Sequence, residues 1–301
     1  MNSPSKTKTS EAMHRVALGT AQFGQRYGVA NTAGQVGVTE VAAILERGRL
    51  HGMDTLDTAM AYGDSETCLG RAGVGSWRVI TKLSPLPGDV GDVGPWVEAR
   101  VRESLERLRV TSVDALLLHR PADLYGPHRA ELLRALAGLK ARGLIGAAGV
   151  SIYAPEDLEA VWPFWRPDIV QAPCSVLDQR LIRSGWLEKL QAHGTRVHLR
   201  SVFLQGLLLM PPATRPRYFL RWQGVLDDWR TWCVTNSVSP LNAALGFVCG
   251  LTCVERLVVG VDSLAQLQEI LDAAASNGPV VPEHLGSDDR DLLEPSRWQV
   301  V

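Results

Sequence analysis

Four side chains capable of acid–base chemistry stand at or just after short apolar runs of the chain. They are Asp57 in TLDTA, Tyr62 in the following loop AYGDSE, Lys82 in VITKL and His119 in LLLHR. An acid, a phenol, an amine and an imidazole can together move a proton to or from a carbonyl or hydroxyl oxygen. These four residue types, each at or just after an apolar run, indicate an active site more specifically than any one of them alone.

Neither the phenol nor the amine titrates near neutral pH when free, because their pKa values are about 10 and about 10.4. A buried Lys82 ammonium beside Tyr62 would favour the phenolate and make the phenol a better proton donor. Asp57 would hold Lys82 charged and in place, so we expect these three to act as one relay. His119 could then orient a substrate carbonyl by a hydrogen bond and stabilise the developing alkoxide.

Each residue also has an ordinary structural interpretation. Asp57 could cap a turn, and Lys82 could lie on the surface at a strand end. His119 could be a buried barrel histidine, and Tyr62 could pack beside Gly63. Singly, none of them indicates catalysis. Their occurrence together after successive predicted strands favours an active site.

Strand-like and helix-like segments alternate from about residue 38 onward. Apolar runs such as RVITKL and VDALLLHR are followed by stretches with helical spacing, such as PWVEARVRESLERLRV and HRAELLRALAGLKARG. Repeated strand–helix units predict a parallel sheet, because parallel strands need long crossovers. About seven or eight such units without a GxGxxG motif favour a closed (β/α)8 TIM barrel over an open doubly wound sheet. Functional side chains in such a barrel project from the carboxyl ends of the strands, where the four residues fall.

The N-terminal part of the chain carries two further expectations. The segment RVALGTAQFGQRYGV alternates and contains glycines, which predicts a small β-hairpin that closes one end of the barrel. Residues 1–13 are polar and lack the apolar core of a secretory signal, which predicts a disordered leader before one domain at 14–301. No run approaches the roughly 18 to 20 apolar residues of a membrane span. We therefore expect a soluble, cytoplasmic protein.

The composition excludes several classes of function. The 301 residues contain 31 Lys+Arg and 32 Asp+Glu, for a formal net charge of −1. A nucleic-acid-binding protein would show a basic excess or a basic stripe, and this sequence has neither. The five cysteines include no CxxC pair, which argues against a disulfide framework and against a zinc site. The expected partner is a small molecule, without nucleic acid, membrane or metal.

Several segments resemble the aldo-keto reductase family. DTAMAYGDSE, ITKL and LLLHRP are similar to its signature segments, in which Asp, Tyr, Lys and His form a catalytic tetrad. GLIGAAGVSIY, DIVQAPCSVLD, VHLRSVFLQGLLL and VVGVDSLAQLQEIL are similar to its later strands and cofactor-binding segments. The resemblance extends from about Val16 to Ala275. It implies a (β/α)8 barrel that transfers hydride between NADP(H) or NAD(H) and a carbonyl compound, without a metal.

The resemblance also assigns roles to residues. It makes Tyr62 the general acid–base, the Asp57 and Lys82 pair its tuning groups, and His119 the residue that orients the carbonyl. Segment 201–205 would wrap the cofactor pyrophosphate, and the segment around 260–269 would hold the adenosine half. The full set of implied cofactor-binding residues is Thr20, Ser151, Gln171, Arg200, Ser201, Phe203, Gln205, Gly260, Asp262, Ser263, Gln266 and Glu269, of which Ser151 and Gln171 would bind the nicotinamide carboxamide.

Three positions depart from the family pattern. Ile152 follows Ser151 where an Asn is usual, so one polar contact to the carboxamide is missing. Arg200 stands where a Tyr often stacks on the nicotinamide, and it would place a positive charge beside a ring that is cationic when oxidised. Asp262 stands where many relatives carry a Lys or Arg for the 2′-phosphate of NADP, and a carboxylate repels phosphate but can accept a ribose hydroxyl. We therefore expect a weakened NADP preference or use of both cofactors, unless Arg256 or another cation compensates.

Two long loops are candidates for the substrate pocket. LSPLPGDVGDVGPW and LQGLLLMPPATRPRYFLRW are rich in proline and apolar residues, with irregular packing as the alternative. Candidate wall residues are Trp96, Met210, Phe219 and Trp222, and candidates for contact with an anionic group, such as a phosphate or nucleotide sugar, are Arg215, Arg217 and Arg221. The carbonyl substrate (a sugar derivative is one candidate), the direction of reaction and the oligomeric state stay open.

Two other functions also stay open. Lys82 at a strand end could form a Schiff base with a carbonyl substrate, as in an aldolase. The chain could instead be a regulatory subunit that binds a nicotinamide cofactor and turns over slowly, although the intact set of four residues argues against this.

Overall fold

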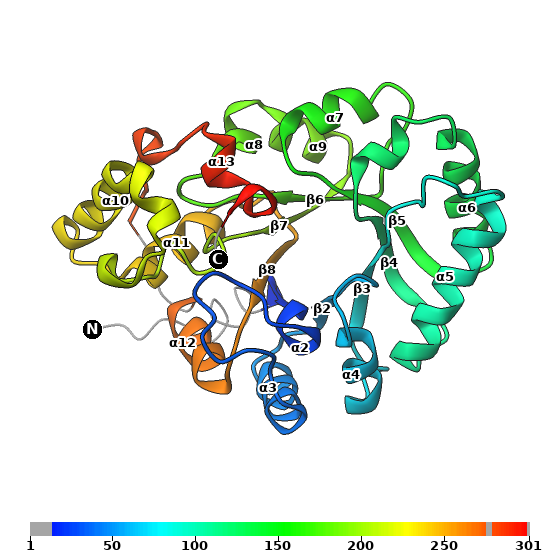
Figure 1. The fold of residues 1–301 in the computed structure, drawn as a ribbon, viewed down its shortest axis with the longest axis horizontal. Coiled ribbons are helices and arrows are strands. Elements are labelled where there is room, and N and C mark those ends of the chain that lie inside the picture. The colour runs from blue at the N-terminus through cyan, green and yellow to red at the C-terminus, as the bar shows by residue number, and fades with distance from the viewer. Residues whose placement is uncertain (1–13, 275–278, 300–301) are drawn as a thin grey trace.

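The computed structural model describes residues 14–274 and 279–299, and in this part of the chain eight parallel strands close into a barrel in sequence order (Figure 1). The strands are β1 Val16–Gly19, β2 Thr55–Asp57, β3 Arg78–Leu83, β4 Val113–Leu118, β5 Ile145–Ser151, β6 Ile169–Pro173, β7 Arg196–Arg200 and β8 Arg256–Gly260. β8 returns to pair with β1, with Leu18 opposite Val259. The predicted (β/α)8 barrel is confirmed.

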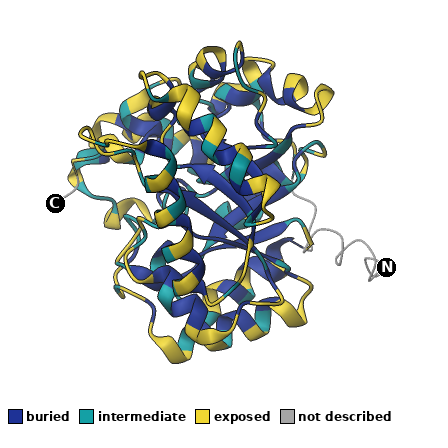
Figure 2. Cartoon of the chain, turned by 90° about the vertical axis from the view of Figure 1, so that its right-hand side faces the viewer, coloured by how far each residue is buried: buried dark blue, intermediate teal, exposed yellow. Residues whose placement is uncertain are grey.

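Helices cover the outside of the barrel. The helices are α2 Ala21–Gly24, α3 Val38–Leu50, α4 Ser65–Ala72, α5 Val93–Leu108, α6 Arg129–Ala141, α7 Pro155–Val161, α8 Arg180–Arg183, α9 Trp186–Ala192, α10 Gln223–Thr235, α11 Pro240–Cys249, α12 Leu264–Ala274 and α13 Arg290–Leu293. Short 3-10 turns are η1 Pro121–Leu124, η2 Pro212–Thr214, η3 Arg217–Trp222, η4 Glu283–Leu285 and η5 Pro295–Arg297. Figure 2 shows buried strands inside and exposed outer helix faces.

Helix α5 illustrates why these segments are helical. Val97 and Val101 lie one turn apart on the buried face, as expected for an amphipathic helix packed on strands. The Asp92 side chain caps the first turn by accepting a hydrogen bond from Gly94 N at 3.2 Å. The helix ends where Arg109 adopts the left-handed conformation, with φ of 56°.

The barrel interior is filled by alternate strand residues, because successive residues of a strand face opposite sides. A buried apolar layer inside the barrel consists of Ile80, Ala115, Leu117, Ala147 and Ile169. Lys82 lies two residues after Ile80 on β3, and Gln171 lies two residues after Ile169 on β6. The period of two therefore places polar side chains above an apolar layer, at the carboxyl end of the strands.

Charged side chains close the opposite, amino-terminal end of the barrel. Glu255 lies 3.0 Å from His198 Nε2, and Arg256 donates a hydrogen bond to Thr55 Oγ1 at 3.0 Å. Burial raises the pKa of Glu255, but the hydrogen bond from His198 and the charges of Arg196 and Arg256 outweigh it and lower that pKa to about 2. These charges are paired within the closed end and are structural.

The predicted N-terminal β-hairpin is wrong. Residues 16–19 form β1, which pairs in parallel with both β2 and β8. All four residues of β1 are buried, as in a strand covered on both faces. The glycines permit close packing instead of a hairpin turn, since a Cβ on Gly19 would lie 3.2 Å from Val258 Cγ1.

A second apolar cluster lies beneath α10, α11 and α13, which gather beside the barrel in Figure 1. Phe219, Trp222 and Trp229 are buried in it, and Trp298 near the C-terminus meets Phe219 edge to face at 4.8 Å. The predicted leader, residues 1–13, lies outside the described residues. Within 14–274 and 279–299, no helix is long and apolar enough to cross a membrane.

Candidate active site

The carboxyl ends of β2, β3 and β4 bring the four predicted catalytic residues together. Asp57 is the last residue of β2, Tyr62 lies in the loop before α4, Lys82 lies in β3 and His119 follows β4. Lys82 Nζ is 2.6 Å from Asp57 Oδ2 and 3.5 Å from Tyr62 Oη. The rings of Tyr62 and His119 meet edge to face, with centroids 5.7 Å apart. The strand ends therefore assemble an acid, an amine, a phenol and an imidazole at one point.

Asp57 and Lys82 form a buried ion pair, with 3% and 0% of their surfaces exposed. Lys82 Nζ also donates to the Thr58 carbonyl at 2.9 Å, and Gln171 Nε2 donates to Asp57 Oδ1 at 2.6 Å. Burial lowers the pKa of Lys82, and the negative charge of Asp57 opposes this effect. Because both ions have several partners, the pair forms a fixed support behind Tyr62.

Tyr62 is a neutral phenol in this arrangement. Burial and the negative charge of Asp57 raise its pKa above the ordinary value, and the positive charge of Arg200 opposes them. Burial and Asp57, which lies 2.6 Å from Lys82 Nζ, oppose the expected shift toward phenolate. The proton-donating form of Tyr62 therefore predominates at neutral pH.

His119 is a neutral imidazole beside this phenol. Burial and the positive charges of Lys82 and Arg200 lower the pKa of His119 to about 4. A neutral imidazole carries one N–H donor, so His119 can donate a hydrogen bond without adding a charge to the site.

The loop that carries Tyr62 is fixed by the first strand–helix unit. Ser65 Oγ donates to the Thr20 carbonyl at 2.8 Å, and Thr20 Oγ1 donates to the Asp57 carbonyl at 3.0 Å. Gly24 packs so closely on this loop that a Cβ would lie 1.8 Å from the Tyr62 carbonyl oxygen. Helix α2 therefore determines where Tyr62 lies.

We expect Gly24→Ala to lower the free energy of unfolding by about 1–3 kcal/mol, because the added methyl group meets backbone that must move. The position of Tyr62 would change with it, so activity should fall as well. Urea unfolding measures the stability, with Gly75→Ala as the control, since a Cβ on Gly75 meets nothing within 4 Å. Equal stabilities of the two variants would contradict this prediction.

A cavity of about 640 Å³ opens beside Tyr62. Of the predicted cofactor-binding residues, its wall includes Thr20, Arg200, Ser201, Phe203, Gln205, Gly260, Asp262, Gln266 and Glu269. Ser151, Gln171 and Ser263 do not line it. The wall also includes Gln22 and residues 27–32, which the sequence analysis missed. Recognising residues 16–19 as a barrel strand would have indicated them, because loops after barrel strands form such sites.

The loop after β7 offers backbone groups to this cavity. Ser201, Leu204 and Gln205 have φ of 61°, 47° and 53°. Left-handed residues can turn backbone N–H groups toward one concave side, which suits an anion, and non-glycine residues keep this costly conformation mainly at functional sites. The Gln205 carbonyl also accepts a hydrogen bond from Ala30 N at 3.4 Å. The loops after β1 and β7 therefore meet beside the cavity.

One side-chain atom of Gln171 is left without a hydrogen bond within the part of the chain that the structure describes. Its Oε1 atom is buried and has no hydrogen-bond partner among the described residues. Leaving a buried polar atom unpaired costs about 1–3 kcal/mol, so such an atom in a native structure requires an explanation. Ser151 is buried at the matching position of β5, paired in register with Gln171. The two side chains come from neighbouring strand ends.

Asp262 lies in the cavity wall, and no cation among the described residues pairs with it. Its Oδ1 accepts a hydrogen bond from Asn31 Nδ2 at 3.0 Å. Burial raises the pKa of Asp262, and hydrogen bonds from Gln266 and Gln22 oppose this effect. Arg256, considered above as a compensating cation, lies at the amino-terminal end of the barrel and does not compensate.

One of the two long loops lines the cavity and the other does not. The loop LQGLLLMPPATRPRYFLRW contributes Gln205, Gly206, Leu209, Met210, Pro211 and Thr214, whereas LSPLPGDVGDVGPW contributes no residue. Of the candidate wall residues, Met210 lines the cavity, and Phe219, Trp222 and Trp96 instead pack in or against the apolar clusters. The arginines proposed to meet an anion do not line it either. Arg215 is 3.0 Å from Asp227 and Arg221 is 3.3 Å from Asp289, so these guanidinium groups already have partners.

Comparison with known proteins identifies the family. The model of the aldo/keto reductase family matches residues 15–282, so the chain belongs to this family of oxidoreductases. No curated protein sequence matches the chain. Among the described residues, no group of three or more His, Cys, Asp and Glu side chains could hold a metal ion.

Solved structures share the fold. An aldo-keto reductase from Bacillus halodurans, in its holo form, is similar with a TM-score of 0.73 and 21% identity over 94% of this chain and 95% of that chain. The glycerol dehydrogenase from Gluconobacter oxydans is similar with a TM-score of 0.66 and 24% identity over 90% of this chain and 88% of that chain. At these identities the likeness is one of architecture.

Proposed function

We propose that this chain is a nicotinamide-cofactor-dependent reductase that interconverts a carbonyl compound and its alcohol. The observation that carries the proposal is the placement of the Tyr62 phenol on the cavity wall, with the buried Asp57–Lys82 pair behind it and His119 beside it. A phenol and an imidazole donor at one point can hold and protonate a carbonyl oxygen.

The residues would divide the chemistry as follows. When bound, a reduced nicotinamide would supply the hydride for the carbonyl carbon. Tyr62 Oη gives its proton to the carbonyl oxygen, and an N–H of His119 holds that oxygen in place. The ammonium of Lys82, 3.5 Å from Tyr62 Oη, stabilises the phenolate left after proton transfer, and Asp57 keeps the ammonium in position. In alcohol oxidation, the same phenolate accepts the proton.

The residues present fit such a cofactor. The unpaired buried Oε1 of Gln171 is an acceptor of the kind that a carboxamide N–H group needs, and Ser151 is its neighbour. The left-handed backbone of the loop after β7 suits a diphosphate. The segment around 260–269 would hold the adenosine half. Each of these assignments agrees with the role that the family resemblance implies.

We expect kcat/KM with NADH to equal or exceed that with NADPH. Asp262 repels a 2′-phosphate, and Arg200 is the one Lys or Arg among the described residues that line the cavity. Asp262→Ala should raise kcat/KM with NADPH relative to kcat/KM with NADH by about tenfold. The control is Asp272→Ala, at an exposed residue of α12 outside the cavity. A strong NADPH preference in the wild type, unchanged in Asp262→Ala, would refute this account of cofactor choice.

An aldolase that uses a Schiff base at Lys82 is the second candidate. Lys82 Nζ lies within hydrogen-bond distance of three oxygen atoms, Asp57 Oδ2, the Thr58 carbonyl and Tyr62 Oη, and its side chain is fully buried, which favours the reductase. Borohydride trapping with a carbonyl substrate discriminates between them, since covalent attachment at Lys82 is expected only of the aldolase. A regulatory subunit is distinguished by turnover, because a reductase shows turnover that depends on Tyr62.

A further inference from the structure

Arg200 brings an unneutralised positive charge to the cavity wall. Its Nη2 donates to the Ile152 carbonyl at 2.9 Å, and its Nη1 donates to Ser201 Oγ at 3.2 Å. The guanidinium lies 5.0 Å from the centre of the Tyr153 ring. All these partners are neutral, and among the described residues no carboxylate oxygen lies within 4 Å of Arg200, whereas Arg180 lies 2.8 Å from Asp178. A half-buried guanidinium without an acid is an open anion site.

The charges around the reacting centre leave a net positive charge. Asp57 and Lys82 cancel at 2.6 Å. Tyr62 and His119 are neutral near pH 7, because the pKa of the first is raised and that of the second is lowered to about 4. Arg200 and Tyr62 line the same cavity. The centre therefore carries about one positive charge, and one negative charge from a ligand would balance it.

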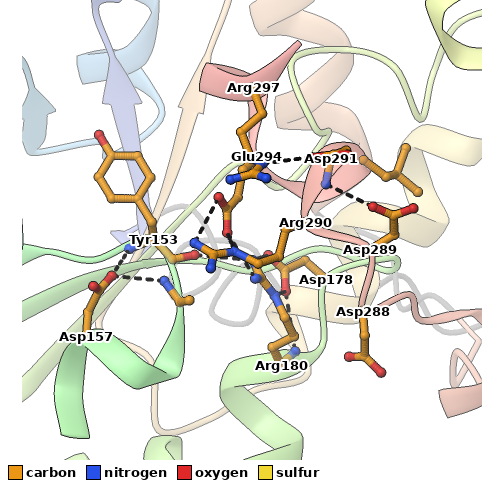
Figure 3. A network of polar contacts seen from close by, with 12 residues as sticks. Tyr153, Asp157, Asp178, Arg180, Asp288, Asp289, Arg290, Asp291, Glu294 and Arg297 are labelled. Atoms are coloured by element: carbon orange, nitrogen blue, oxygen red, sulfur yellow. Dashed lines mark hydrogen bonds and ion pairs between the residues drawn. The ribbon is translucent and has the colours of Figure 1, made fainter. Parts of the chain in front are cut away.

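The ring beneath this guanidinium is held firmly. The backbone N–H of Tyr153 donates to Asp157 Oδ2 at 2.8 Å, and its carbonyl accepts from Arg180 Nη2 at 3.2 Å. Arg180 is in turn held by Asp178 at 2.8 Å and by Glu294 at 3.3 Å, as Figure 3 shows. The C-terminal segment that carries Glu294 thereby fixes the platform on which the guanidinium lies. Such preorganisation favours recognition of one ligand geometry.

We propose that Arg200 binds a carboxylate of the substrate, so that the preferred substrates are carbonyl compounds with an anionic group next to the reacting carbon, as in 2-oxo acids. This inference rests on the proposed reductase function. The two outer N–H groups of a guanidinium match the two oxygens of a carboxylate. With the carbonyl oxygen at Tyr62, a carboxylate on the adjacent carbon would lie in the cavity that Arg200 also lines.

Asp262 and Glu269 also line the cavity wall, and a substrate carboxylate beside either of them would be repelled. A phosphate of the cofactor shares the chemistry of a carboxylate and is the other anion that Arg200 could meet. Arg200 lines the same cavity as Tyr62, which favours the substrate.

The test compares phenylglyoxylate with its uncharged amide, phenylglyoxylamide, at saturating cofactor. The ratio of the two kcat/KM values reports the anion preference and cancels any general loss of activity. We expect the wild type to favour phenylglyoxylate by about 10- to 100-fold, the range for a hydrogen bond to a charged group, and Arg200→Leu to lower the ratio to near 1. Arg200→Lys should keep part of the preference, because it retains the charge without the paired donors. Arg217→Leu, at an exposed arginine outside the cavity, is the matched control and should keep the wild-type ratio.

Cofactor affinity, measured for each variant by tryptophan fluorescence, separates the sources of the anion. A wild-type ratio near 1, or a ratio unchanged in Arg200→Leu, would overturn the inference. So would a loss of cofactor affinity with an unchanged ratio, which would assign Arg200 to a cofactor phosphate. If the protein turns over the amide but not phenylglyoxylate, the reductase function stands and this inference fails. If the protein neither binds a cofactor nor turns over any substrate, the reductase function and this inference are both rejected.

Discussion

Tyr62→Phe is expected to lower kcat for carbonyl reduction by about 10²- to 10⁴-fold, the usual contribution of a positioned general acid. The ring would stay in place, since its loop is held by backbone and hydroxyl contacts that do not involve the phenol oxygen. Only the proton donor is lost, so cofactor affinity should change little. Steady-state reduction of a small aldehyde, followed by loss of reduced cofactor, measures the effect.

The matched control for this substitution is Tyr125→Phe. Tyr125 is 49% exposed, and its hydroxyl donates to Asp157 at 2.9 Å, outside the cavity. Its removal should leave kcat within about threefold of the wild type. A Tyr62→Phe variant as active as Tyr125→Phe would exclude the phenol as the proton donor.

Lys82→Met is expected to destabilise the protein by about 3–5 kcal/mol and to abolish most activity. The substitution leaves Asp57 as a buried carboxylate without its counter-ion, which is the costly way to break a buried pair. Removing both charges in Asp57→Asn with Lys82→Met should recover much of the stability but none of the activity. The free energy of unfolding in urea and kcat, measured for the two single variants and the double variant, form a double-mutant cycle that tests this prediction.

Lys140→Met provides the control on the surface. Lys140 lies 2.6 Å from Asp168, the same separation as in the buried pair, but both side chains are more than a third exposed. An exposed pair contributes about 0–1 kcal/mol. Equal destabilisation by Lys82→Met and Lys140→Met, with no recovery in the double variant, would show that the buried pair does not support the site.

The barrel and the tetrad could be predicted because their signals are local. Alternating strand and helix patterns predict a parallel barrel, and residues that end neighbouring strands must meet at one edge. β1 could not be recognised in the same way, because its four residues have no preceding helix and the glycines around them resemble turn residues. Its misassignment is also why Gln22 and residues 27–32 were missed.

The electrostatics of the site could not be read from residue types. A buried Lys82 held by Asp57 was expected to favour the phenolate of Tyr62, but burial and the negative charge of Asp57 raise the pKa of that phenol. Likewise, Arg215 and Arg221 are plausible anion ligands by sequence alone, yet each has a carboxylate partner. Arg200 lacks one, and only the three-dimensional arrangement distinguishes it.

Titration of the purified protein with NADH, and separately with NADPH, examines the reductase proposal before any substrate is known. The chain has nine tryptophans, whose fluorescence should be quenched on binding, and calorimetry gives an independent value of Kd. We predict saturable binding with Kd in the micromolar range, roughly −8 kcal/mol, for at least one of the two cofactors, and binding of NADH at least as tight as that of NADPH. Absence of binding of both, by fluorescence and by calorimetry, would contradict the proposed function.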